Sequence, residues 1–418
     1  MSRRTTTAAV ARAVAIAAVL ACGTAEAGQA ATRSKQPARR TSPAAAPSAP
    51  APTTAATAAD RADHAARAGR AALERGEAAK AIELVEPVLA KEPGHPLAAA
   101  VKIDALLGLG ERPRALDAYE AWFNVVRAED AALLNRIAVA ELEALQAEPL
   151  LQMDALAALS TQQGPRGTRA RTQLTEFATA NPPSSRSWPA IVALCRLGDA
   201  AAAKRAAQAY RESTGSGRVT ALDAVIASGG PGAEEILRDA LRVRDAMLQS
   251  TAADGASTLK LKGLVPDLQQ VAKTGEMFAR FTAAVALAHL GATGGETLLE
   301  AGATSPAQDA RLRVAGARKA RGDKGWIEAT RPLLASDDVA VRYQAAAMLL
   351  EVDRPAALKV LQTGTQDPNT AVRTLVADVV TKDPGTPVAE LRRLLRDGVP
   401  RVRLSAAAAI LRHPAPPQ

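Results

Sequence analysis

Aromatic residues are scarce in this chain, at 2% of 418 residues, although hydrophobic residues make up 48%. Any core must therefore be built from Ala, Leu, Val and Ile. Strand-rich cores draw on β-branched and aromatic residues, so this composition favours close-packed helices with small contact residues. One compact core stops growing at roughly 250–300 residues. An elongated array, whose units pack only on their neighbours, removes that limit.

Cysteine and histidine are also rare, with two Cys and four His in the whole chain. None of the histidines has a second His or Cys at metal-ligand spacing, so we predict no metal site and no cofactor. Cys195 lies in the apolar helix-like run 191–195. We expect it to be a small buried hydrophobe, because a reactive thiol needs an electropositive and partly open site.

Sequence motifs that carry chemistry are missing as well. The chain has no Gly-x-Ser-x-Gly elbow and no Gly-Lys-Ser/Thr phosphate loop. Glu234 and Glu235 are adjacent on one predicted helix, where acidic residues favour the N-terminus, whereas paired catalytic carboxylates face each other across a cleft. We therefore expect no catalytic residues, and we expect the protein not to be an enzyme.

The positive net charge is concentrated at the N-terminus. Residues 1–59 contain seven basic residues and one acidic residue, so they account for six of the nine net positive charges. The remaining chain is close to balanced and lacks the basic footprint of a phosphate-binding surface. Nucleic acid is therefore not an expected partner.

The first 27 residues predict a secretory signal peptide. A basic start is followed by a short apolar run and by Ala25-Glu26-Ala27, an A-x-A cleavage signature. The run 19–22, Val-Leu-Ala-Cys, resembles a bacterial lipobox, which makes lipidation of Cys22 the alternative to plain cleavage. Either route places the protein in the periplasm or cell envelope, and a lipid on Cys22 is its only expected contact with a membrane.

Residues 28–59 are rich in Ala, Pro and Thr and predict a disordered linker, because they have little apolar surface to bury. From residue 60 onward the pattern is helical, and segments 62–95 and 96–129 align at a period of 34 residues. The matching positions are Gly76 with Gly110, Ala81 with Ala115, and Val88 with Trp122. Residues 60–148 resemble tetratricopeptide repeats.

The resemblance to tetratricopeptide repeats implies an inner groove lined by first-helix side chains. Carried onto this chain, the expected partner-binding residues are Asp63, Arg70, Glu74, Asp104 and Leu107. Arg70 and Asp104 are expected to set the polarity of a bound peptide. The alternative is an ordinary solvated helix face.

The C-terminal half has a different period of roughly 30 residues. In the last three units an Asp-containing turn and a Val precede the marker arginine, and small apolar residues follow it. The marker arginines are Arg280, Arg313, Arg342, Arg373 and Arg403. This pattern resembles the HEAT-like repeats also found in phycobilisome lyases, and it covers residues 217–413. The arginines either line a face that grips an acidic partner or bind Asp turns within the stack, and carboxylate pairing favours the second role.

Residues 149–216 predict degenerate helical hairpins between the two repeat types. The chain is thus expected to be an all-α solenoid of stacked antiparallel hairpins, tetratricopeptide-like and then HEAT-like, after a disordered N-terminus. The expected function is an exported scaffold that binds a protein or peptide partner. The alternative is an accessory factor or lyase-like enzyme built on the HEAT-like repeats.

Overall fold

The computed structural model describes residues 58–180, 186–230 and 232–412. Within these ranges all regular structure is helical, with 22 α-helices, two short 3-10 helices and no strand. Consecutive helices pack on one another, which confirms the predicted all-α solenoid. The predicted signal peptide, Cys22 and the linker up to residue 57 lie outside the described residues. The last two residues of the predicted linker already belong to the first described helix.

The described chain divides into two compact units, which separate between Leu133 and Leu134. We call them the N-terminal unit and the C-terminal unit. The N-terminal unit contains α2 (Ala58–Glu74), α3 (Ala78–Lys91), α4 (Pro96–Gly108) and α5 (Arg112–Val126). Helix α6 (Ala131–Leu145) begins at the end of this unit and continues into the next.

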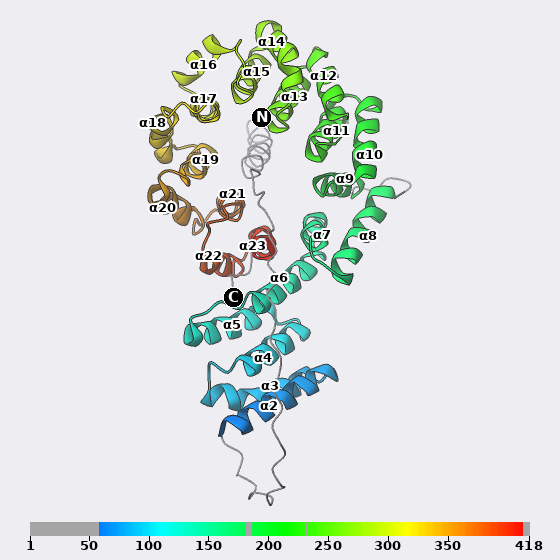
Figure 1. The fold of residues 1–418 in the computed structure, drawn as a ribbon, viewed down its shortest axis with the longest axis vertical. Coiled ribbons are helices and arrows are strands. Elements are labelled where there is room, and N and C mark those ends of the chain that lie inside the picture. Colours follow the sequence, from blue (N-terminus) through cyan, green and yellow to red (C-terminus); the bar gives the residue numbers. More distant parts are fainter. Residues whose placement is uncertain (1–57, 181–185, 231, 413–418) are drawn as a thin grey trace, which may run out of the picture. The chain divides into compact units, whose positions relative to one another are not determined.

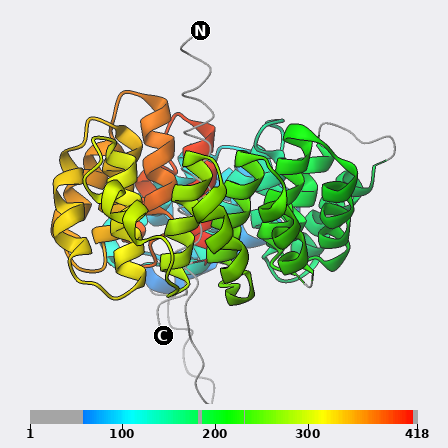
Figure 2. The ribbon, with the colours of Figure 1, turned by 90° about the horizontal axis from the view of Figure 1, so that it is seen from above.

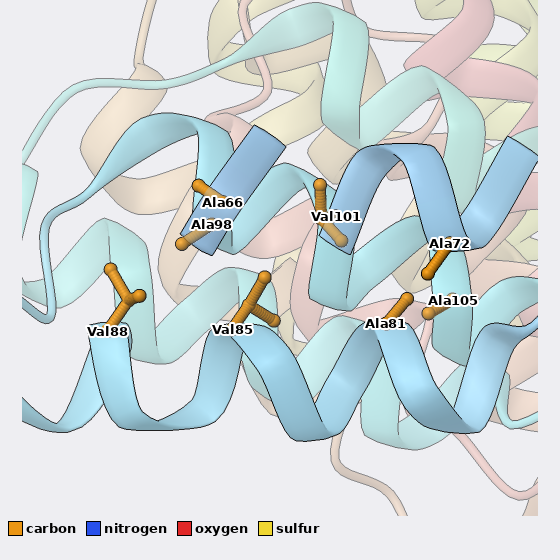
Figure 3. Close-up of a cluster of buried hydrophobic side chains, with 8 residues drawn as sticks. All are labelled: Ala66, Ala72, Ala81, Val85, Val88, Ala98, Val101 and Ala105. Carbon is orange, nitrogen blue, oxygen red and sulfur yellow. The ribbon is translucent and has the colours of Figure 1, made fainter. Parts of the chain in front are cut away.

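Small residues let the helices of the N-terminal unit pack closely. The buried cluster of α2, α3 and α4 consists of alanines and valines only (Figure 3). A Cβ atom on Gly69 of α2 would lie 2.7 Å from Val85 Cγ1, so no larger residue fits there without a shift. Gly76 and Gly110 have φ of 81° and 77° in the two equivalent turns, a conformation that glycine adopts without strain. The two turns, one repeat apart in sequence, therefore have the same backbone conformation.

The helices of the C-terminal unit form two layers (Figure 1). The inner layer contains α7 (Gln152–Ser160), α9 (Ser187–Arg196), α11 (Gly215–Ser228), α13 (Ala246–Thr258), α15 (Met277–His289), α17 (Gln308–Ala320), α19 (Val339–Leu349), α21 (Thr370–Val380) and α23 (Pro400–Arg412). The outer layer contains α8 (Pro165–Thr179), α10 (Ala200–Glu212), α12 (Ala233–Arg242), α14 (Val265–Thr274), α16 (Glu296–Ala303), α18 (Trp326–Thr330), α20 (Arg354–Gly364) and α22 (Val388–Leu394). The 3-10 helices are η1 (Lys262–Leu264) and η2 (Arg331–Ala335).

Each inner helix packs on the inner helices before and after it, and the row closes on itself because α23 packs on α7. The C-terminal unit is therefore a ring of hairpins, which Figure 1 shows face-on and Figure 2 shows from the side. Two ion pairs join its ends: Arg401 binds Asp154 of α7, and Arg403 Nε lies 2.7 Å from Glu141 Oε1 of α6. The repeat pattern predicted the stacking order but gave no sign of this closure.

The inner helices α19 and α21 begin with polar N-cap residues that belong to the Asp- and Asn-containing turns. Asp338 Oδ1 accepts hydrogen bonds from the backbone N–H groups of Ala340 and Val341, at 2.8 and 3.2 Å. Asn369 Oδ1 accepts one from Ala371, at 3.0 Å. Such caps satisfy N–H groups that have no partner inside the helix. Asp338 and Asn369 therefore cap the helices that follow them.

Candidate functional site

The candidate partner-binding face lies on α2 and α4 of the N-terminal unit, which pack side by side. Arg70 and Asp104 occupy equivalent positions one repeat apart on these helices. Arg70 Nη1 lies 2.9 Å from Asp104 Oδ2, and the two side chains are 35% and 16% exposed. The structure thus brings together the two residues that were expected to set the polarity of a bound peptide. Because the two charges are paired with each other, a partner at this face would contact a neutral ion pair with one positive and one negative end.

Asp63 lies about two helical turns before Arg70 on α2, and its carboxylate also has partners. Its Oδ1 lies 3.2 Å from His95 Nε2, and its Oδ2 lies 3.4 Å from Arg67 Nη2. His95 is the N-cap residue of α4, where its Nδ1 accepts a hydrogen bond from the Ala98 N–H at 3.3 Å. The imidazole therefore connects the start of α4 to the second turn of α2.

Glu74 and Leu107 complete the set of predicted contact residues at the C-terminal ends of α2 and α4. Glu74 is exposed and Leu107 is half-buried. Leu109, which follows α4, is 49% exposed. This end of the face therefore offers the Glu74 carboxylate and part of the Leu107 side chain to a partner. The expectation that these residues bind a partner stays a prediction.

The marker arginines of the C-terminal unit bind the turns of the stack. Arg373 forms a bidentate pair with Asp397 of the next repeat, with Nε–Oδ2 at 2.9 Å and Nη2–Oδ1 at 3.2 Å. It also donates to the carbonyl of Asp367 in its own turn, at 2.8 Å. Arg342 and Arg403 donate to the carbonyls of Ser336 and Asp397, at 2.5 and 2.9 Å. Arg280 donates to the carbonyl of Ala272, at 3.1 Å. The predicted pairing with a turn Asp of the next repeat is thus found for Arg373, whereas Arg280, Arg342 and Arg403 bind backbone carbonyl groups.

Arg313 departs from this pattern because it pairs with a carboxylate on an inner helix that is not its neighbour. Its Nη2 lies 3.1 Å from Asp254 Oδ1, which joins α17 to α13 across the intervening α15. The guanidinium also lies 5.7 Å from the centroid of the Phe281 ring of α15. Arg313 therefore links three successive inner helices.

Cys195 is buried, with 1% of its surface exposed, which confirms the expected role as a small hydrophobe. Burial, with the nearby charge of Asp199, raises the pKa of this thiol to about 11. A thiol with so high a pKa is a poor nucleophile at neutral pH. The structure gives it a packing role in α9.

His289 ends α15, and its imidazole hydrogen-bonds the backbone of Gly316 on α17. Burial is the main cause that lowers its pKa, and the charge of Arg313 acts in the same direction. This histidine therefore joins neighbouring repeats. Among the described residues no group of three or more His, Cys, Asp or Glu side chains is placed to hold a metal ion.

Comparison with known proteins assigns no family to the chain. No family model matches it, and no curated protein matches it either. Within the described ranges no helix is both long and apolar enough to cross a membrane.

Proposed function

We propose that this protein is an exported helical-repeat scaffold that binds a protein or peptide partner and performs no catalysis. The supporting observation is the face formed by α2 and α4, where equivalent positions of two successive hairpins stand side by side. Arg70 and Asp104 are held in one geometry there, next to exposed Glu74. Stacked hairpins bury one side of each helix and leave such a continuous face for a partner.

We further propose that the hairpins of residues 60–148 are tetratricopeptide repeats and those of residues 217–413 are HEAT-like repeats. The equivalent Gly76 and Gly110 turns, and the buried Ala81 and Ala115, support the first assignment. The recurring bond from Arg342, Arg373 and Arg403 to the carbonyl six residues earlier supports the second.

Site-specific photocrosslinking in the native cell envelope tests the binding proposal. A benzophenone amino acid at position 74 or 107 is expected to crosslink a specific protein, because both positions lie on the α2–α4 face. The matched control is position 83, an exposed residue of α3 in the same unit. Equal crosslinking from position 83, or none from either face position, would contradict the proposal.

Export and lipidation are proposed from the N-terminal sequence alone. Labelled fatty acid is expected to enter the wild-type chain and not Cys22→Ala if Cys22 is the anchor. Plain signal cleavage predicts instead a mature N-terminus at residue 28 and no label in either chain. A chain that stays in the cytoplasm with residues 1–27 attached excludes both routes.

A further inference from the structure

Large apolar side chains are exposed at the start of two adjacent inner helices of the C-terminal unit. Met277 and Phe278 begin α15 and are 76% and 48% exposed, and Met247 in the first turn of α13 is 44% exposed. The whole chain contains only four Phe and five Met residues. One Phe and two Met of this small set are therefore left in solvent at the ends of neighbouring helices.

A buried hydrogen bond fixes how α13 and α15 are aligned. Ser250 Oγ donates to Thr282 Oγ1 at 3.2 Å, near the start of each helix. Met247 lies three residues before Ser250, and Phe278 lies four residues before Thr282. Each therefore stands one turn earlier on the same side of its helix. Because α13 and α15 pack side by side (Figure 1), Met247 and Phe278 are neighbours at one edge of the ring.

Met277 extends this surface toward the next repeat. It lies one turn before Phe281 on the same side of α15. Phe281 packs on the buried cluster formed by α15, α16 and α17. The exposed side chains thus continue the apolar interior outward at the start of α15. We call Met247, Met277 and Phe278 the apolar edge.

The apolar edge is too small to hold a stable dimer by itself. Three side chains with these exposed fractions present on the order of 300 Å² of apolar surface, which is the size of functional patches on soluble monomers. Each partner in a stable complex buries about 800 Å². A short segment with a few apolar side chains matches the edge, whereas a second folded copy would need further contacts.

The charges beside the apolar edge favour an acidic segment. Arg244 precedes the N-cap residue of α13, Lys273 lies in the last turn of α14, and both are exposed. Among the described residues neither cation has an ion-pair partner. The carboxylate of Asp245 is already occupied, because it accepts hydrogen bonds from two N–H groups at the start of α13. Glu276 adds one exposed carboxylate, so the two free cations outnumber it.

We propose that the apolar edge binds a short acidic peptide segment of a partner protein, whose apolar side chains alternate with carboxylates. The apolar side chains pack on Met247, Met277 and Phe278, and the carboxylates pair with Arg244 and Lys273. Methionine side chains are flexible and polarisable, so they adapt to apolar groups of different shape. The class of partner rests on the proposed function, but this site belongs to the C-terminal unit and not to the α2–α4 face.

Fluorescence anisotropy with the full chain and a labelled octapeptide, Asp-Leu-Leu-Asp-Glu-Leu-Leu-Asp, tests this site. Replacing its leucines by serine, or its acidic residues by lysine, should weaken binding about tenfold or more. In the protein, Phe278→Ser should lower the affinity about tenfold, and Met277→Ser and Lys273→Gln about threefold each. The matched control is Leu150→Ser, which removes an almost fully exposed leucine elsewhere in the same unit and should leave the affinity unchanged. Failure of the octapeptide to bind, or equal affinity in all variants, overturns the proposal.

Two further measurements locate the peptide and define its class. Met277→Ser should keep the melting temperature of the wild type, because its side chain is mostly in solvent, so a loss of affinity in this variant reports the contact and not the fold. A photoreactive leucine in the octapeptide should crosslink to α13 or α15. Crosslinks confined to α2 and α4 overturn this site and leave the proposed function standing. Tighter binding to phosphatidylglycerol vesicles than to the peptide, lost in Phe278→Ser, would assign the apolar edge to a membrane surface and overturn the peptide proposal.

Discussion

Arg403 and Glu141 are 262 residues apart in the chain and form an ion pair of 2.7 Å that closes the ring of the C-terminal unit. The preceding marker arginine, Arg373, reaches forward to Asp397 in the turn of the next repeat. Arg403 pairs instead with Glu141 of α6. Helix α6 thus supplies to Arg403 the kind of carboxylate that the next turn supplies to Arg373.

Breaking this pair should destabilise the C-terminal unit. Glu141 is 7% exposed, so Arg403→Ala leaves a buried carboxylate without its guanidinium. Loss of one partner of a buried pair costs about 3 kcal/mol of unfolding free energy. Urea unfolding followed by circular dichroism measures the change, and small-angle scattering should show a larger radius of gyration if the ring opens.

The matched control for the Arg403–Glu141 pair is Arg242→Ala in the same unit. Arg242 is 67% exposed and pairs with Asp267, so its loss should change stability by less than about 1 kcal/mol. An exchange of charges, Arg403→Glu with Glu141→Arg, should recover part of the loss. Equal stability of Arg403→Ala and Arg242→Ala would show that the Arg403–Glu141 pair contributes nothing to the free energy of unfolding.

Gly69→Ala should destabilise the N-terminal unit. The added methyl group would lie 2.7 Å from Val85 Cγ1 and 3.2 Å from Val101 Cγ1, and overpacking of this kind costs about 1–3 kcal/mol. Gly108→Ala is the matched control, because nothing lies within 4 Å of its new Cβ at the end of α4. That change should be neutral or stabilising by up to about 1 kcal/mol. A common effect of both substitutions in thermal unfolding would rule out close packing at Gly69 as the cause.

Cys195 should resist thiol reagents in the folded protein. Its pKa of about 11 leaves little thiolate at pH 8, so reaction should be at least about 100-fold slower than for a free cysteine. The test uses Cys22→Ala, which leaves Cys195 as the single thiol, with and without urea. Because the thiol loses its proton more readily in the unfolded chain, stability should fall as the pH rises from 9 toward 11. Fast labelling of the native protein at pH 8 would refute the buried assignment.

Asp338→Ala should remove a helix cap from α19. Two N–H groups lose their acceptor, at a cost of about 1 kcal/mol. Asp338→Asn retains a side-chain oxygen and should be close to wild type, as Asn369 is at the equivalent position of α21. Chemical unfolding of the three proteins separates the cap from a charge effect, since a purely electrostatic role predicts that Asn and Ala are equally damaging.

Local features of the fold were predictable because they depend on neighbours in sequence. The helix boundary at α10 is of this kind, because Asp199 caps the helix that begins at Ala200. The burial of Cys195 followed from its apolar run. The bond from His289 at the end of α15 to the next repeat is not a local feature. A single helix end does not reveal which neighbouring backbone lies within reach.

The candidate site also combines features that the sequence predicts with features that only the structure shows. The sequence placed Arg70 and Asp104 on one face, because they are one repeat period apart. It did not show that they pair with each other at 2.9 Å, which removes both as free charges. That distance depends on how closely α2 and α4 approach, and small buried residues such as Ala66 and Ala98 set this approach.

Composition and period by themselves determined that this chain forms stacked helical hairpins, because small apolar residues at helical spacing bury surface only against adjacent helices. Tertiary structure alone decided that the C-terminal hairpins close into a ring, in which α23 packs on α7. Closure depends on the sum of small rotations between successive hairpins, and no local pattern records that sum. The contacts that complete it, from Arg401 to Asp154 and from Arg403 to Glu141, therefore join residues that no sequence pattern relates to each other.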